Sequence, residues 1–238
     1  MKAMILAAGM GKRMLPLTTL QPKPLLYAGK YRLIEHNLIA LQKAGVNEVV
    51  INTHYLSEQI KQTVGDGRRF GLKITHVVEN ETLLGTGGGI KNALPHLGNN
   101  PFLLISADIW TDFPLEALMQ RTVKDAHLVM VKNPTFHPGG DYTLDENAII
   151  QPPNQHTLTF ASLGLIHPHL LSYAKESVFD LATVLQVAIK KQRVTGEVYC
   201  GHWWNVGTPK LLKFYCGIIP ATDEDSFNNK PSVNFGGG

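Results

Sequence analysis

Short apolar runs alternate with helical patterns along the first 131 residues. The apolar runs predict strands at 4–8, 48–51, 73–78, 102–105 and 127–131. Between them, hydrophobic residues at helical spacing predict helices, as Ile34, Leu38 and Leu41 do for the first one. This order favours a mixed, mostly parallel sheet flanked by helices, because each parallel connection requires a crossover. The pattern therefore predicts an α/β fold that binds its ligands at the carboxyl ends of the strands.

The pattern changes after about residue 134, where proline and glycine interrupt short segments. Segments 141–144 and 157–166 predict a small, partly antiparallel β-rich subregion. Helical patterns at 181–190 and 209–215 complete one expected domain over residues 1–220. The polar, glycine-ended segment 221–238 predicts a flexible tail.

Composition excludes several classes of protein. A net charge of +3 and scattered basic residues argue against nucleic-acid and membrane partners. No apolar run is long enough for a transmembrane helix, and no signal peptide precedes the first strand. Cys200 and Cys216 form neither a disulfide framework nor a metal pattern, so we expect reduced thiols in the core. Together these features predict a cytoplasmic protein, either a monomer or a small homo-oligomer.

The first strand ends in a basic turn that contains glycine. Gly9 and Gly11 lead directly into Lys12 and Arg13, and Lys23 follows between two prolines. A glycine turn after a buried strand exposes successive backbone N–H groups, which form a nest for anions. Two adjacent cations and a third held by prolines suit a polyphosphate better than a single carboxylate. The turn therefore predicts a triphosphate-binding loop.

Two better-known glycine loops do not fit this turn. The dinucleotide-binding pattern requires a third glycine, where this chain has Met14. The Walker A pattern requires Ser or Thr after Gly-Lys, where this chain has Arg13. The loop therefore belongs to a different class of phosphate-binding protein.

Asp108 follows the apolar run 102–105 and should lie at the same sheet edge as the basic loop. A carboxylate beside a triphosphate would repel it unless a divalent cation lay between them. Mg²⁺ typically takes one or two protein oxygens together with phosphate oxygens. We therefore interpret Asp108 as a metal ligand, with a cap of the following turn as the alternative.

The sequence contains no Gly-x-Ser-x-Gly elbow, no His-Glu-x-x-His motif and no evident pair of nucleophile and base. An acceptor that is a phosphate monoester needs none, because its second pKa of about 6 leaves it a dianion at neutral pH. The residues thus indicate nucleotidyl transfer from a nucleoside triphosphate to a sugar phosphate, with pyrophosphate as the leaving group.

The motifs as a set resemble those of the sugar-1-phosphate nucleotidylyltransferases. The resemblance covers residues 1 to about 215 and rests on LAAGMGKRMLPLT with PKPL, on Leu84–Gly88, on Asp108, on Asn133-Pro134 with Gly140-Asp141-Tyr142, on Thr157–Phe160 and on Gly201–Thr208. The set is most similar to the N-acetylmuramate 1-phosphate uridylyltransferases of bacterial wall recycling. It implies a Rossmann-like nucleotidyltransferase fold, Mg²⁺, UTP and an N-acetylmuramate 1-phosphate acceptor.

The resemblance also implies a role for individual residues. Residues about 1–133 would form the nucleotide-binding part and about 134–220 the sugar-phosphate-binding part. Catalysis would rest on Arg13, Lys23 and Asp108, and Asp108 with Asn205 would hold the metal. The sugar phosphate would be bound by Asn133, Gly140 and Asp141. The nucleotide would be bound by Leu6, Ala7, Ala8, Gly9, Gly11, Lys12, Arg13, Lys23, Asn80, Gly85 and Thr86.

Three features differ from the uridylyltransferase pattern. Asn205 stands where that subgroup usually has Asp, Gly85 where it tends to have Glu, and Phe160-Ala161-Ser162 where Phe-Ser-Gly is expected. Gly85 leaves guanylyl transfer to a hexose or heptose 1-phosphate as an alternative. Asn205 leaves a non-catalytic, nucleotide-sugar-binding regulatory subunit as another. Sequence alone also leaves open whether Glu79 and Glu81 contact the base or are only loop charges.

Overall fold

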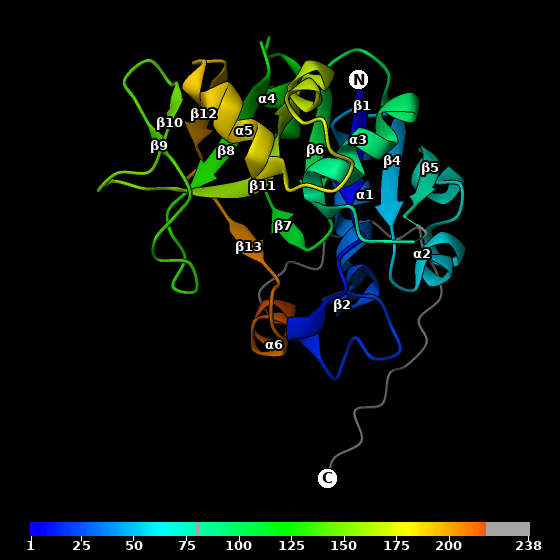
Figure 1. Ribbon diagram of the computed structural model, residues 1–238. Coiled ribbons are helices and arrows are strands. Elements are labelled where there is room, and N and C mark those ends of the chain that lie inside the picture. The colour runs from blue at the N-terminus through cyan, green and yellow to red at the C-terminus, as the bar shows by residue number, and fades with distance from the viewer. Residues whose placement is uncertain (80, 218–238) are drawn as a thin grey trace.

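Figure 1 shows the computed structural model, which describes residues 1–79 and 81–217. Asn80 and the predicted tail at 221–238 lie outside the described residues. In the described part, no helix is long and apolar enough to cross a membrane.

A seven-stranded mixed sheet forms the centre of the protein, in the order β12-β8-β11-β6-β1-β4-β5. Neighbouring strands pair in parallel except at β11, which is antiparallel to both β6 and β8. The α/β class and the mixed, mostly parallel sheet are thus confirmed. The strands are β1 (Lys2–Leu6), β4 (Glu48–Thr53), β5 (Lys73–Val78), β6 (Phe102–Ser106), β8 (Ala126–Val131), β11 (Thr159–Ile166) and β12 (Val194–Val198).

Helices cover both faces of the sheet, and two hydrophobic cores result because successive side chains of a strand point to opposite faces. In β1, Ile5 packs in the core that also contains α1, α2 and α4, while Met4 packs beneath α3 and α5. Figure 1 shows α3 and α5 together on the near face. The helices are α1 (Leu33–Lys43), α2 (Ser57–Val64), α3 (Gly85–Leu97), α4 (Leu115–Met119), α5 (Leu181–Lys190) and α6 (Pro209–Cys216).

Three small two-stranded sheets lie beside the main one, at β2 (Tyr27–Ala28) with β3 (Tyr31–Arg32), β7 (Ile109–Thr111) with β13 (Trp203–Asn205), and β9 (Thr143–Leu144) with β10 (Ile150–Gln151). Short 3-10 helices occur at Lys12–Met14, Lys23–Leu25, Arg68–Phe70 and Pro168–Tyr173. The β7–β13 pair brings β13, the last strand in the described part of the chain, next to the segment that follows β6.

Two expectations were wrong. Segment 157–166 does not belong to a separate β-rich subregion, because its residues 159–166 form β11 in the middle of the main sheet. Cys200 and Cys216 are exposed free thiols rather than core residues. Both errors have the same physical cause: strand pairing and burial at these positions depend on partners far away in the sequence.

Candidate active site

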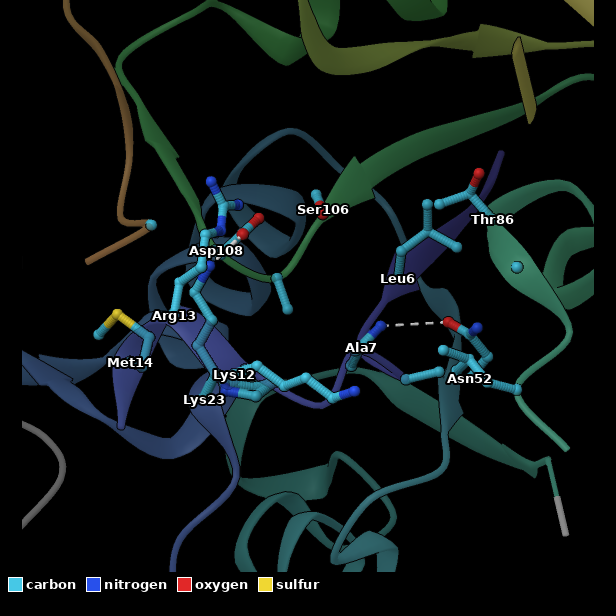
Figure 2. A pocket seen from close by; sticks show the side chains of 18 of the residues that line it. Leu6, Ala7, Lys12, Arg13, Met14, Lys23, Asn52, Thr86, Ser106 and Asp108 are labelled. Carbon is cyan, nitrogen blue, oxygen red and sulfur yellow. Dashed lines mark hydrogen bonds and ion pairs between the residues drawn. The ribbon is translucent and has the colours of Figure 1, made fainter. Parts of the chain in front are cut away.

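A cavity of about 370 Å³ opens where β1 and β6 end. Figure 2 shows Lys12, Arg13, Lys23 and Asp108 on one side of it and Asn52 and Thr86 on the other. Each predicted nucleotide-binding residue that the structure describes lines this cavity. Its walls consist of Leu6, Ala7, Ala8, Gly9, Gly11, Lys12, Arg13, Met14, Lys23, Pro24, Asn52, Leu83, Gly85, Thr86, Ser106, Ala107, Asp108, Asp180 and Gly207.

The basic loop is held in place by Gly11. Its φ of +62° lies in the left-handed region, and a Cβ there would be only 3.0 Å from Thr18 and 3.2 Å from Lys23. The Thr18 hydroxyl donates to the Gly11 carbonyl at 2.8 Å. Met14, fully buried, anchors the other end of the turn. These contacts bring Lys12 and Arg13 to the cavity beside Lys23.

Lys23 forms an ion pair with Asp108, although 85 positions separate them in the chain. Both side chains are largely buried, with 12% and 22% of their surface exposed. Asp108 lies there because the segment after β6 continues along β1, with the Ala107 N–H donating to the Leu6 carbonyl at 2.9 Å. Asp108 thus lies at the same sheet edge as the basic loop, as the sequence predicted, whereas its ion pair with Lys23 was not predicted.

Asn205 lies close to Asp108 through the β7–β13 pair. The Val206 N–H donates to the Asp108 carbonyl at 2.9 Å, and Asn205 pairs with Ile109. Gly207 lines the cavity, and a Cβ placed on it would lie 3.4 Å from Oδ1 of Asn205. The side-chain oxygen of Asn205 therefore lies next to Gly207. Asn205 does not itself line the cavity, whereas Asp108 does. A carboxylate and a neighbouring amide oxygen are hard donors of the kind that fit a divalent cation, and a metal held by both stays a prediction.

The opposite wall begins at the turn into α3. Gly85 has φ of +75°, and a Cβ there would lie 2.6 Å from the Phe179 carbonyl oxygen. Thr86 accepts a hydrogen bond from the Leu181 N–H at 2.8 Å. The glycine is therefore required by the backbone conformation and by close packing against the segment before α5, whichever base the site accepts.

Asn52 and Asp180 are among the lining residues that the sequence did not predict. Asn52 is the penultimate residue of the buried strand β4, at the ligand-binding edge, and this position was a usable signal. Asp180 precedes α5, and nothing in the sequence distinguishes it from an ordinary helix cap. Of the two undecided carboxylates, Glu79 is buried and does not line the cavity, while Glu81 is exposed.

A second cavity of about 360 Å³ adjoins the first, and the two share Leu6, Thr86, Ser106 and Asp180 as walls. Asp141 lines it, held by the Phe160 N–H at 2.8 Å and by His137 at 3.0 Å. Burial, with a smaller contribution from the Asp141 charge, raises the pKa of Tyr142 to about 12, so its hydroxyl stays protonated. The remaining walls are Leu104, Tyr142, Phe160, Ser162, Leu181, Ala182 and Leu185.

Asn133 and Gly140 do not line this second cavity. The Asn133 amide donates to the Pro138 carbonyl and to the Thr157 hydroxyl. Gly140 has φ of +59°, and a Cβ there would be 2.6 Å from Oδ1 of Asn133. The structure thus gives both residues a place in the loop that precedes Asp141, and their contact with a sugar phosphate stays a prediction.

Comparison with known proteins identifies the family. Residues 2–140, more than half of the chain, match the family model described as Nucleotidyl transferase. The chain is 40% identical over 221 residues to an N-acetylmuramate alpha-1-phosphate uridylyltransferase of Neisseria meningitidis serogroup B, covering 90% of this chain and 96% of that protein. A protein of the same name from Caulobacter vibrioides is 29% identical and covers 87% of this chain and 92% of the relative.

The fold has solved counterparts. The crystal structure of a putative glucose-1-phosphate thymidylyltransferase from Bacillus anthracis, in complex with a sucrose, superposes with a TM-score of 0.81 at 20% identity. The match covers 95% of this chain and 97% of that one. The family model, the full-length Neisseria relative and the cavity geometry agree, and the chain belongs to the nucleotidyl transferase family.

Proposed function

We propose that the protein transfers a uridylyl group from UTP to N-acetylmuramate 1-phosphate, giving a UDP-sugar and pyrophosphate. The observation that carries the proposal is the pair of adjoining cavities. One is lined by the glycine loop, three cations and Asp108, and the other by Asp141, with Ser106 shared between them. The choice of uridylyl group and muramate acceptor is supported by the full-length relative at 40% identity.

In this proposal, the residues of the first cavity bind and orient the triphosphate. Backbone N–H groups of residues 9–13 with Lys12 and Arg13 bind the β- and γ-phosphates, and Lys23 contacts the α-phosphate. Residues Gly85 and Thr86 face the base. These contacts turn the α-phosphorus toward the second cavity, with its bond to the leaving pyrophosphate pointing away from that cavity, as in-line attack requires.

The acceptor phosphate needs no general base in this scheme. Its oxygen attacks the α-phosphorus, the bond to the bridging oxygen breaks, and pyrophosphate leaves with that electron pair. Family members generally use a divalent metal, and we propose Mg²⁺ held by Asp108 and Asn205. When bound, it would neutralise charge that develops on the leaving pyrophosphate. Lys23, now paired with Asp108, would then be free to contact the nucleotide.

The sugar is held from the second cavity. Asp141 is an acceptor for sugar hydroxyl groups, and its fixed contacts with Phe160 and His137 orient it before the substrate arrives. The division into a nucleotide part up to about 133 and a sugar-phosphate part beyond it belongs to the same proposal. So do a cytoplasmic location and a monomeric or small oligomeric state.

Pyrophosphate release, assayed separately with UTP and GTP and a panel of sugar 1-phosphates, tests this proposal. We expect release with UTP that depends on N-acetylmuramate 1-phosphate and on Mg²⁺, with the UDP-sugar identified by mass. A preference for GTP with a hexose or heptose 1-phosphate would favour the guanylyltransferase alternative. Binding without turnover for every combination would favour a regulatory subunit.

A further inference from the structure

The carboxylate of Glu79 is buried directly behind the nucleotide cavity. Only 3% of the residue is exposed, and it does not line the cavity itself. One of its oxygens accepts from Nδ2 of Asn52 at 2.7 Å, and the other accepts from the Leu84 N–H at 2.9 Å. Among the described residues, no ion pair involves Glu79. Burying a carboxylate is costly, so a role that requires both acceptor oxygens would explain it.

The orientation of Asn52 explains why a carboxylate is needed. The Ala7 N–H donates to Oδ1 of Asn52 at 3.1 Å, the interaction drawn as a dashed line in Figure 2. This contact turns the Nδ2 end of Asn52 toward Glu79. Glu79 therefore faces two donors, the Asn52 amide and the Leu84 N–H. A glutamine could accept from only one of them, because its other terminal atom is itself a donor.

The hydrogen bonds join two opposite walls of the cavity. Ala7 belongs to the wall formed by the end of β1 and the glycine loop, whereas Leu84 immediately precedes Gly85 and Thr86 on the other wall. Helix α3 packs directly on the link, since a Cβ at Gly89 would lie 2.6 Å from both Nδ2 of Asn52 and Oε1 of Glu79. The distance between the walls thus depends on this buried pair.

We propose that Glu79 and Asn52 are positioning residues that set the spacing between the phosphate wall and the Gly85–Thr86 wall. Through that spacing, they determine how much the nucleoside adds to nucleotide affinity and how well one base is distinguished from another. The inference rests on the proposed function in one respect, namely that Gly85 and Thr86 face the base. It does not depend on which base or sugar is preferred.

The variant Glu79→Gln tests the inference through binding rather than turnover. Calorimetry would compare UTP with pyrophosphate, which reaches only the phosphate wall. We expect the affinity for UTP to fall about tenfold, as when one buried hydrogen bond to a charged group is lost. The affinity for pyrophosphate should change less than about twofold, since it does not reach the Gly85–Thr86 wall. The KM of the sugar 1-phosphate is not a control, because Thr86 also lines the second cavity.

Glu81→Gln is the matched control, because it removes the same charge from an exposed side chain of the same loop. It should leave both affinities unchanged. Asn52→Ser is the second variant, in case Glu79→Gln fails to fold. It breaks the link at its other member, while the Ala7 N–H keeps its bond to the residue 52 carbonyl at 3.2 Å, and it should show the same selective loss for UTP.

Equal weakening of UTP and pyrophosphate in a folded variant would overturn the inference, because the pair would then act on the phosphate wall or on the fold as a whole. Unchanged UTP affinity would also overturn it. If the wild-type protein prefers another nucleoside triphosphate, the same comparison with pyrophosphate is made with that nucleotide. Such a preference bears on the proposed function, whereas the selective loss bears on the buried pair.

Discussion

The two adjoining cavities differ in charge. The first cavity, which we propose binds the nucleotide, carries Lys12, Arg13 and Lys23, while the described lining of the second cavity contains the carboxylates of Asp141 and Asp180 and no Lys, Arg or His. Both proposed substrates carry phosphate, so the cations of the first cavity would have to serve both of them. The second cavity is suited to hydroxyl groups, for which a carboxylate is a good acceptor.

This difference follows from how the two halves of the sheet are built. Beside the first cavity, β1 pairs in parallel with β4 and β6, and its carboxyl end opens into the glycine loop. Beside the second cavity, the antiparallel strand β11 changes its pairing with β8 between Phe160 and Gly164. A bulge of this kind redirects side chains into a site. The first half thus presents backbone donors and cations, and the second presents individual side chains.

The largest effect should come from Asp108, the carboxylate that lies on the same side of the first cavity as the cations. Asp108→Ala removes a proposed metal ligand and the partner of Lys23. We expect pyrophosphate release to fall at least about 1,000-fold, since a metal ion supplies several kcal/mol of charge stabilisation. Glu116→Ala, an exposed carboxylate on α4, is the control. Near-normal rates for Asp108→Ala across a Mg²⁺ titration would disprove the metal assignment.

A cation that serves both substrates should affect the kinetics of both. Arg13→Ala should lower kcat/KM about 100-fold for the nucleotide and for the sugar phosphate alike, as the loss of one transition-state donor does. Lys43→Ala, at an exposed position on α1, should change neither. If only the nucleotide parameters changed, the acceptor phosphate would have to be held elsewhere, and the proposed sharing of charge would be wrong.

A substitution of Asp141 in the second cavity should change only the binding of the sugar 1-phosphate acceptor. Asp141→Asn should raise the KM of the sugar 1-phosphate about tenfold, the effect of weakening a hydrogen bond to a charged group. The KM of the nucleotide should stay unchanged. Because Asp141 also accepts from the Phe160 N–H, thermal unfolding must accompany the kinetics. Equal changes in both KM values would show that the two cavities do not act separately.

The smallest effect concerns strain in the bulge of β11. Ser162 has φ of +54°, in the region that favours glycine, and it lines the second cavity. Ser162→Gly should stabilise the protein by about 1 kcal/mol in urea unfolding, with at most a few-fold change in acceptor KM. Ser162→Ala keeps the strained backbone and should not be stabilised. A loss of stability in the glycine variant would mean that this conformation carries no strain.

Local sequence patterns predicted much of the fold. The periodicity gave β5 and α5 with the bounds that the structure has. It also placed Asp108 at the same sheet edge as the basic loop, since the carboxyl ends of parallel strands meet there. Gly11 of the basic loop could be recognised because a left-handed turn after a buried strand has few alternatives to glycine.

Long-range pairing was not predictable in the same way. Nothing within residues 159–166 shows that this strand enters the sheet between β6 and β8. The buried pair of Asn52 and Glu79 joins residues 27 positions apart, and the sequence left Glu79 undecided. Both depend on which surfaces meet after folding, and a pattern read along one segment contains no information on that.

Gly85 shows most clearly the difference between what the sequence determines and what depends on the tertiary structure. By itself, the sequence determined the alternation of strands and helices, the anion-binding loop and the carboxylate at the same edge, because local periodicity and backbone freedom are properties of short segments. At Gly85, the sequence indicated only that guanylyl transfer remained an alternative to uridylyl transfer. The tertiary structure showed that the Phe179 carbonyl leaves no space for a side chain there, because packing between distant segments is decided only when the whole chain has folded.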